Sequence, residues 1–186
     1  FLSADPKRGK AFIGKNAGNI LLILGGSQGS ETINKIVRES LEELSHHFLV
    51  VHICGPGKKV ESNLENYVQF EFVREEMADL LAAADLVVSR AGSNSLFEII
   101  AMKKPNILIP LGLSSSRGDQ ILNARYAKEK GWSAVITEES LTSETFLQEL
   151  LLLKENSDVY LENLSGFEPK EAVERIITEI ECLQKN

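Results

Sequence analysis

A glycine-rich loop stands between a predicted strand and a predicted helix near the start of the sequence. Residues 25–30 read GGSQGS, follow the apolar run 20–24 and precede a helical pattern that begins near Glu31. Glycine lets backbone N–H groups approach an anion without interference from a Cβ, and a helix start adds partial positive charge. The loop therefore predicts a site for a diphosphate. The alternative is a tight strand-to-helix turn in which a serine caps the helix.

A second loop, residues 89–95 (SRAGSNS), follows another short apolar run and precedes a predicted helix that contains Glu98. Asn94 and Glu98 are four residues apart, so they share one face of that helix near its start. A carboxylate in this place can accept hydrogen bonds from both hydroxyls of a ribose. The alternatives are that Glu98 only complements the helix dipole, or that it pairs with Lys103 or Arg90.

A third loop, residues 112–120 (GLSSSRGDQ), is long and polar and ends where another helix is predicted to start. Its last two residues, Asp119 and Gln120, have side chains that can bind sugar hydroxyls. The alternative is that Asp119 is the N-cap of the helix and that the loop is an ordinary mobile one.

Patterns of some other chemistries are missing. The loop GGSQGS lacks the G-x-G-x-x-G register of a dinucleotide site, and residues 52–55 (HICG) stand where such a fold carries an acidic residue. No Ser or Asp lies at a recognisable spacing from His52, so a Ser-His-Asp hydrolase is not indicated. The sequence also lacks a D-x-D pattern for a divalent cation. We therefore expect helix starts and Arg90 to neutralise phosphates without a metal.

The three loops require a scaffold that brings strand ends together. Short apolar runs recur at 20–24, 48–53, 68–72, 86–88, 106–110 and 133–136, with helical patterns between them. This rhythm is typical of βαβ units. It predicts an α/β fold with a Rossmann-like, doubly wound parallel sheet of about six strands in a single domain, whose ligands bind beyond the carboxyl ends of the strands.

Helices are predicted from apolar stripes and from their end signals. One helix carries the stripe Ile33, Ile36, Val37, Leu41 and Leu44. Others are expected at 94–102, at 119–130 before a glycine, and at about 169–183. Residues 1–18 are predicted to be a linker, or a short helix that arrives from another part of a longer protein, and residues 19–186 the ligand-binding domain.

Composition narrows the class of protein. The chain has 186 residues with 43% hydrophobic content, and 20 basic against 27 acidic residues give a net charge of −7. Such a charge disfavours a nucleic-acid-binding domain, although a local anion site remains compatible with it. Cys54 and Cys182 are far apart and suggest neither a zinc site nor a disulfide framework. We see no membrane-spanning run or signal peptide and expect a cytoplasmic protein.

The three loops together resemble one known family. The segments GGSQGS, SRAGSNSLFEIIAMKKPNILIPL and SRGDQILNARYAKEKGWSAVI are similar, in order and spacing, to the carboxyl-terminal domain of MurG, and the likeness covers about residues 18–145. Members of that family are UDP-N-acetylglucosamine:lipid I N-acetylglucosaminyltransferases of peptidoglycan synthesis with the GT-B fold. The resemblance implies that residues 19–186 form the UDP-sugar-binding, carboxyl-terminal half of such an enzyme.

The resemblance also implies roles for particular residues. Those expected to face the diphosphate are Gly26, Ser27, Gln28, Gly29, Gly92, Ser93 and Asn94, with Arg90 beside them. Glu98 is expected to hold the ribose, the backbone near Val73 to read the uracil edge, and Asp119 and Gln120 to contact the N-acetylglucosamine hydroxyls. The donor is UDP-GlcNAc, and neither a cofactor nor a metal is expected.

The family's acceptor-binding, amino-terminal half, which carries the candidate catalytic base, has no counterpart here. We therefore expect no catalytic residue in this chain and no activity from it alone. In the full-length protein, that half would bring a lipid-linked acceptor at the inner face of the cell membrane, where the protein would be peripheral. The alternatives are a stand-alone donor subunit of a split transferase of the Alg13/Alg14 type, and a nucleotide-binding regulatory or oxidoreductase domain.

Overall fold

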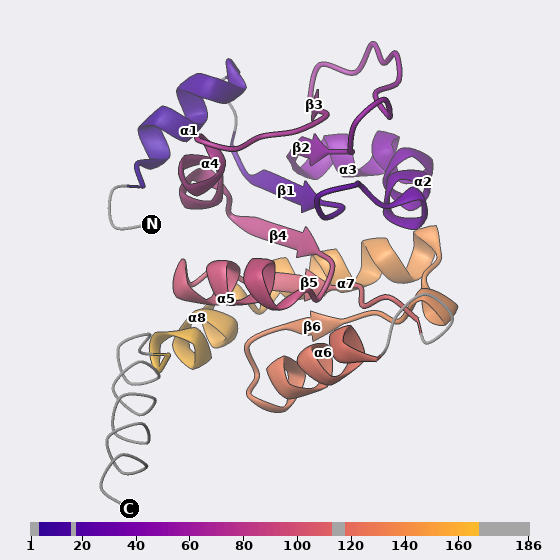
Figure 1. Ribbon diagram of the computed structural model, residues 1–186. Coiled ribbons are helices and arrows are strands. Elements are labelled where there is room, and N and C mark those ends of the chain that lie inside the picture. Colours follow the sequence, from indigo (N-terminus) through magenta and orange to yellow (C-terminus); the bar gives the residue numbers. More distant parts are fainter. Residues whose placement is uncertain (1–3, 16–17, 113–117, 168–186) are drawn as a thin grey trace, which may run out of the picture.

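A six-stranded parallel sheet forms the centre of the molecule. The computed structural model describes residues 4–15, 18–112 and 118–167. The strands are β1 (Ile20–Leu24), β2 (Leu49–Ile53), β3 (Tyr67–Phe70), β4 (Leu86–Ser89), β5 (Asn106–Leu108) and β6 (Ala134–Val135). They lie in the order β3-β2-β1-β4-β5-β6, and every neighbouring pair is parallel (Figure 1). The predicted fold class is confirmed, with strand ends displaced by two residues or fewer.

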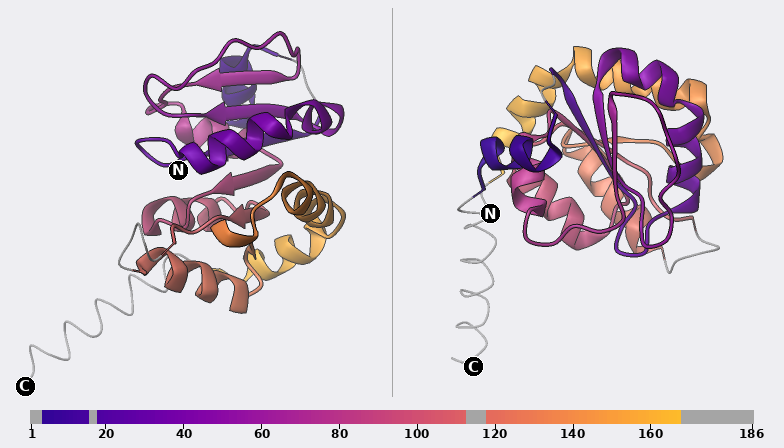
Figure 2. Two further views of the ribbon diagram at one scale, coloured as in Figure 1. Left: turned by 90° about the vertical axis from the view of Figure 1, so that its right-hand side faces the viewer. Right: turned by 90° about the horizontal axis from the view of Figure 1, so that it is seen from above.

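Helices cover both faces of this sheet. They are α1 (Pro6–Ile13), α2 (Glu31–Glu39), α3 (Leu41–His47), α4 (Met77–Ala83), α5 (Ser93–Ala101), α6 (Asp119–Glu129), α7 (Ser143–Glu155) and α8 (Ser157–Ser165), with a short 3-10 helix η1 (Glu138–Ser140). Helices α2, α3 and α7 pack on one face, and α1, α4 and α5 on the other (Figure 2). The sheet is therefore buried on both sides, which explains why its strands are continuously apolar.

Alternation along β1 determines which face each side chain meets. Leu21 and Ile23 pack with α2, α3 and α7, whereas Ile20, Leu22 and Leu24 pack with α1 and α4. A third cluster joins α5, α6 and the end of α8. These layers leave the strand ends, where the loops emerge, at one edge of the sheet.

The predicted helix with the stripe from Ile33 to Leu44 is two helices. Helix α2 ends at Glu39 and α3 begins at Leu41, with Ser40 between them at φ −98° and ψ 1°. All five stripe residues nevertheless lie in one buried cluster. The apolar pattern was thus interpreted correctly, but it could not show the bend, because both segments turn the same stripe toward the sheet.

The amino-terminal segment contains a helix that packs on the domain. Helix α1 lies against α4 so closely that a Cβ on Gly9 would be 2.1 Å from the carbonyl oxygen of Asp79. The Arg8 guanidinium also pairs with the Asp79 carboxylate at 2.8 Å. Of the two expectations for residues 1–18, the short helix is the one found for residues 6–13. The helix predicted at 169–183 lies outside the described residues.

Candidate functional site

A cleft of about 660 Å³ opens at the carboxyl ends of β1 and β4. The chain leaves β1 toward β2 on one side and returns to β4 on the other, so this is the point at which the strand order reverses. Loops after such neighbouring strands diverge and leave room for a ligand. The cleft is lined by residues 25–32, Lys58, Arg90, Gly92, Asn94, Ser95, Leu111, Gln120 and Glu138.

The structure brings most of the predicted site residues into this one cleft. Gly26, Ser27, Gln28, Gly29, Arg90, Gly92, Asn94 and Gln120 line it. The other predicted residues, Val73, Ser93, Glu98 and Asp119, are not part of its lining. Three loops that are far apart in the sequence therefore meet at one edge of the sheet, as the strand order requires.

The serine-capped turn, which was the alternative interpretation of the glycine-rich loop, is present in the structure. Ser30 is the N-cap of α2, and its hydroxyl accepts a hydrogen bond from the N–H of Ile33 at 3.3 Å. The residues before the cap still face the cleft. Gly29 has φ +68°, and a Cβ there would be 2.0 Å from the carbonyl oxygen of Cys54. The loop is therefore pressed against the chain that leaves β2, and only glycine fits at this contact.

Residues 25–29 also match the G-x-S-x-G pattern of serine hydrolases. In such an enzyme a histidine ring accepts the proton of the serine hydroxyl. The ring nitrogens of His52 are instead bonded to Tyr67 and Asn34, at 2.8 and 2.9 Å. The pattern here thus belongs to a strand-to-helix turn.

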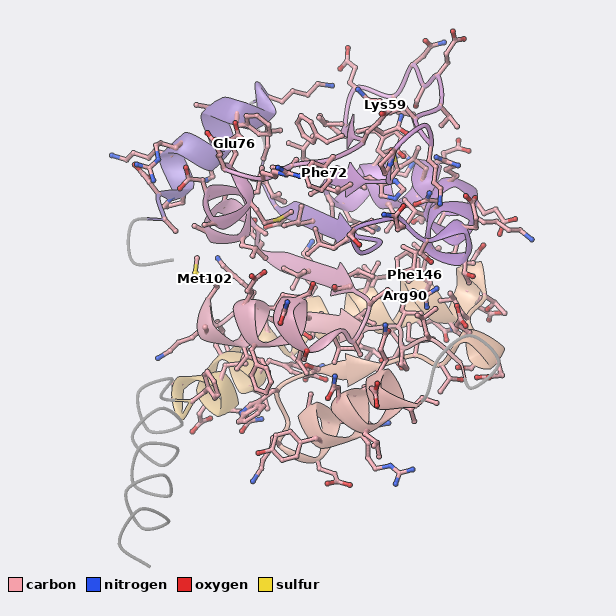
Figure 3. All side chains as sticks on the ribbon, in the orientation of Figure 1. Lys59, Phe72, Glu76, Arg90, Met102 and Phe146 are labelled. Atoms are coloured by element: carbon pink, nitrogen blue, oxygen red, sulfur yellow. The ribbon has the colours of Figure 1, made fainter. Side chains whose placement is uncertain are left out.

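Arg90 lies on the cleft wall but is held by the protein. Figure 3 shows it at the carboxyl end of β4. Its guanidinium donates hydrogen bonds to Ser30 Oγ and to Glu138 Oε1, each at 2.6 Å, and to the carbonyl of Ile109 at 3.0 Å. Arg90 therefore lies at the cleft, and its position is set by the helix cap and by Glu138.

Glu138 connects Arg90 to the loop after β5. Its second oxygen, Oε2, accepts a hydrogen bond from the N–H of Gly112 at 3.1 Å. Burial acts to raise the pKa of Glu138, but the hydrogen bonds from Arg90 and Gly112 outweigh it and the pKa is lowered. The carboxylate thus stays ionised at neutral pH and offsets part of the charge of Arg90.

Glu98 is half-buried on α5, one turn after Asn94. The proposed pairing with Arg90 is wrong, since Arg90 binds Glu138, and Lys103 Nζ donates to the carbonyl of Ser165 at 3.4 Å. Glu98 is the sixth residue of α5, and no acidic residue lies in the first turn of that helix. A dipole role is weak at this position, because the effect falls off within the first turn.

The third loop reaches the cleft through Gln120. Helix α6 begins at Asp119, and its cap is Gly118 with φ +89°, so the alternative that Asp119 is the N-cap is wrong. Gln120 Oε1 accepts a hydrogen bond from the N–H of Leu111 at 3.1 Å, which ties the helix start to the chain after β5. Asp119 is exposed.

Val73 lies beyond the end of β3, and its side chain is buried in the core below α4. The neighbouring Phe72, labelled in Figure 3, is 49% exposed. The Arg74 guanidinium lies 5.1 Å from the centre of the Phe72 ring. Because the Val73 side chain points into the core, only its backbone is available to a ligand.

Sequence reasoning missed two charged residues of the cleft wall. Lys58 follows β2 and pairs with Glu31 at 3.0 Å, and Glu138 follows β6. Both stand a few residues beyond the end of a strand, which is the place where ligand-binding residues of such sheets occur. Their position just beyond a strand end is the sequence signal that points to them.

The described part of the chain holds neither a cluster of metal ligands nor a membrane-spanning helix. Among the described residues, no three His, Cys, Asp or Glu side chains converge as candidate metal ligands. Within the same ranges, no helix is both long and apolar enough to cross a membrane.

The strand order and the glycine-rich cleft at its reversal define an α/β domain of the Rossmann-like class. Residues 20–179 match the glycosyltransferase family 28 C-terminal domain. The chain therefore belongs to this family, and the resemblance to the MurG carboxyl-terminal domain is confirmed.

Curated relatives agree with this assignment. The chain is 50% identical over 160 residues to a UDP-N-acetylglucosamine--N-acetylmuramyl-(pentapeptide) pyrophosphoryl-undecaprenol N-acetylglucosamine transferase of Clostridium botulinum (strain Loch Maree / Type A3), covering 84% of this chain and 45% of the relative. It is 44% identical over 180 residues to the protein of the same name from Clostridium tetani (strain Massachusetts / E88), covering 95% and 50%. The chain thus spans about half the length of these relatives.

Solved structures support the fold. MurG of Acinetobacter baumannii superposes with a TM-score of 0.73 at 20% identity, covering 95% of this chain and 53% of that one. The glycosyltransferase of kitacinnamycin gives a TM-score of 0.68 at 20% identity, covering 81% and 38%.

Proposed function

We propose that this chain binds the donor UDP-GlcNAc for an inverting transfer of N-acetylglucosamine to lipid I, a polyprenyl-diphosphate-linked acceptor of peptidoglycan synthesis. The observation that carries the proposal is the meeting of the three predicted loops in one cleft at the strand reversal. The names of the curated relatives support the choice of donor and acceptor.

The main task of the cleft is to stabilise the leaving diphosphate. An acceptor hydroxyl attacks the anomeric carbon, the bond to the diphosphate breaks, and negative charge grows on UDP. The starts of α2 and α5 both lie at the cleft, and the backbone N–H groups and positive dipole ends there are suited to that charge. Arg90, held by Ser30 and Glu138, adds a fixed positive charge at the same place.

The remaining donor groups are assigned to residues around the cleft. Glu98 accepts the ribose hydroxyls, the backbone at Val73 reads the uracil, and Asp119 and Gln120 bind the sugar. The acceptor and the catalytic base belong to a separate half, with which this chain works at the inner face of the cell membrane.

The first test is binding and transfer by the 186-residue chain itself. We expect calorimetry to detect weak binding of UDP and UDP-GlcNAc, and no binding of NAD(H), which tests the oxidoreductase alternative. We expect no transfer of labelled GlcNAc to lipid I, because the acceptor site lies in the other half. Transfer by the purified chain would contradict this division of labour, and preference for NAD(H) would contradict the proposed function.

The donor should bind without a metal. Helix starts and Arg90 supply the positive charge that a divalent cation provides in other transferases. The dissociation constant of UDP should therefore be the same in EDTA and in Mg²⁺ within about twofold, which is under about 0.5 kcal/mol. A loss of tenfold or more on chelation would show that the cleft needs a cation.

A further inference from the structure

A hydrogen-bonded network of buried polar side chains, formed by Tyr67, His52 and Asn34, lies next to the glycine-rich loop but outside the lining of the cleft. The phenol oxygen of Tyr67 on β3 is 2.8 Å from His52 Nδ1 on β2, and His52 Nε2 is 2.9 Å from Asn34 Oδ1 on α2. Asn34 Nδ2 in turn donates to the carbonyl of Cys54 at 2.9 Å. His52 and Asn34 are both fully buried.

The Cys54 carbonyl at the end of this network determines the direction of every hydrogen bond in the network. The Cys54 carbonyl can only accept, so the Asn34 amide group must donate to it and Asn34 Oδ1 must accept. His52 Nε2 therefore carries the proton, and Nδ1 accepts the phenol hydrogen of Tyr67. Burial, with a smaller contribution from the charge of Arg38, lowers the pKa of His52 to about 4. Burial raises the pKa of Tyr67 to about 12. Both groups are accordingly neutral at physiological pH.

The network ends where the glycine-rich loop contacts the residues that follow β2. The Cys54 carbonyl lies where a Cβ on Gly29 would be 2.0 Å away, and a Cβ on Gly55 would be 2.6 Å from the carbonyl oxygen of Gln28. The N–H of Gly25 also donates to the carbonyl of Ile53 at 3.4 Å. The glycine-rich loop therefore rests, backbone on backbone, on residues 53–55. A displacement of the Cys54 carbonyl toward Gly29 must therefore move Gly29.

We propose that His52 and Asn34 are positioning residues, which hold the Cys54 carbonyl and thereby fix the glycine-rich loop where its N–H groups meet the donor diphosphate. The inference rests on the proposed function, because it requires that the loop bind a diphosphate. A buried polar cluster with no such role would stabilise the fold but would not affect the affinity of the folded chain for phosphate-bearing ligands.

Two substitutions of His52 remove its two hydrogen bonds one at a time. In His52→Gln the amide nitrogen reaches about as far as Nε2, so it can still donate to Asn34 while the partner of Tyr67 is lost. In His52→Asn the shorter amide can still accept from Tyr67, but Asn34 loses its donor. Both variants put an uncharged amide in the same buried place, so they form a matched pair.

The expected result is a selective loss of diphosphate binding. Titration of folded His52→Asn should show an affinity for UDP that is lower by about tenfold, whereas His52→Gln should stay within about threefold of the unmutated chain. Uridine, which has no phosphate, should bind all three proteins equally well in NMR titrations. The ratio of UDP to uridine affinity is the decisive quantity, because a general loss of stability would not change it selectively.

The outcomes distinguish the inference from the proposed function. Failure of the unmutated chain to bind UDP would overturn the proposed function. The inference alone would be overturned if the unmutated chain binds UDP and both variants have the same ratio of UDP to uridine affinity as the unmutated chain. Should His52→Asn not fold, ¹⁵N NMR of the unmutated chain decides. A proton on Nε2 whose resonance shifts when UDP binds supports the inference, and a proton on Nδ1, or no shift, overturns it.

Discussion

Gly29→Ala should destabilise the chain by at least about 2 kcal/mol and weaken its binding of UDP by more than about tenfold. Gly29 has φ +68°, a region that costs an L-residue about 1–2 kcal/mol. The new methyl group would also stand 2.0 Å from the carbonyl oxygen of Cys54. That oxygen belongs to the backbone, so the clash can be relieved only by moving one of the two loops. Urea unfolding measures the first effect, and UDP titration of the folded fraction the second.

Gly14→Ala is the matched control for this substitution. Gly14 has a similar φ of +73°, but a Cβ there would meet no atom of the described residues within 4 Å, and the residue ends α1 away from the cleft. It should show only the cost of the left-handed conformation, about 1–2 kcal/mol, and no change in UDP affinity. If Gly29→Ala and Gly14→Ala lose similar stability and leave UDP binding unchanged, the backbone contact between Gly29 and Cys54 does not explain the role of Gly29.

Glu98→Ala should lower the affinity for UDP by tenfold or more, since a charge-assisted hydrogen bond contributes about 1.5–3 kcal/mol. The carboxylate is half-buried one turn beyond Asn94, and among the described residues it makes no hydrogen bond or ion pair within the protein. Such a group is available to a ligand. The ribose role further requires that the unmutated chain prefer UDP to 2′-deoxy-UDP and that the variant lose this preference.

A second glutamate provides the comparison for Glu98. Glu144 stands in the first turn of α7, where a carboxylate favours the helix dipole. Glu144→Ala should cost about 0.3–1 kcal/mol of stability and leave both nucleotide affinities unchanged. Titration of UDP and 2′-deoxy-UDP into the three proteins, with thermal melts, gives the answer. Retention of the preference for UDP in Glu98→Ala would remove Glu98 from the ribose site.

These experiments examine different layers of one site. In these proposals Glu98 contacts the ligand, and Gly29 belongs to the backbone that faces the diphosphate. His52 holds the Cys54 carbonyl on which that backbone packs. Loss of a ligand contact should change nucleotide selectivity with little effect on unfolding. Loss of the loop contact should change both stability and affinity.

The sequence alone determined the fold class and the edge of the sheet at which the candidate cleft lies. The apolar runs and the stripe from Ile33 to Leu44 predicted strands and helices, because continuous apolar runs and helical periodicity are local properties of the chain. Once the strands are parallel, their carboxyl ends share an edge, so loops 25–30 and 89–95 had to emerge at that edge. The sequence could not show the bend at Ser40, since a straight and a bent helix bury the same stripe.

Only the tertiary structure decided which side chains become partners. Arg90 and Glu138 are 48 residues apart, and nothing local distinguishes Glu138 from the other glutamates as the partner of Arg90. His52 looked isolated in the sequence, because its partners Asn34 and Tyr67 come from a helix and a strand on either side of it in the chain. The reason is physical: periodicity records which face of an element is buried, whereas a hydrogen bond depends on where packing places two particular atoms.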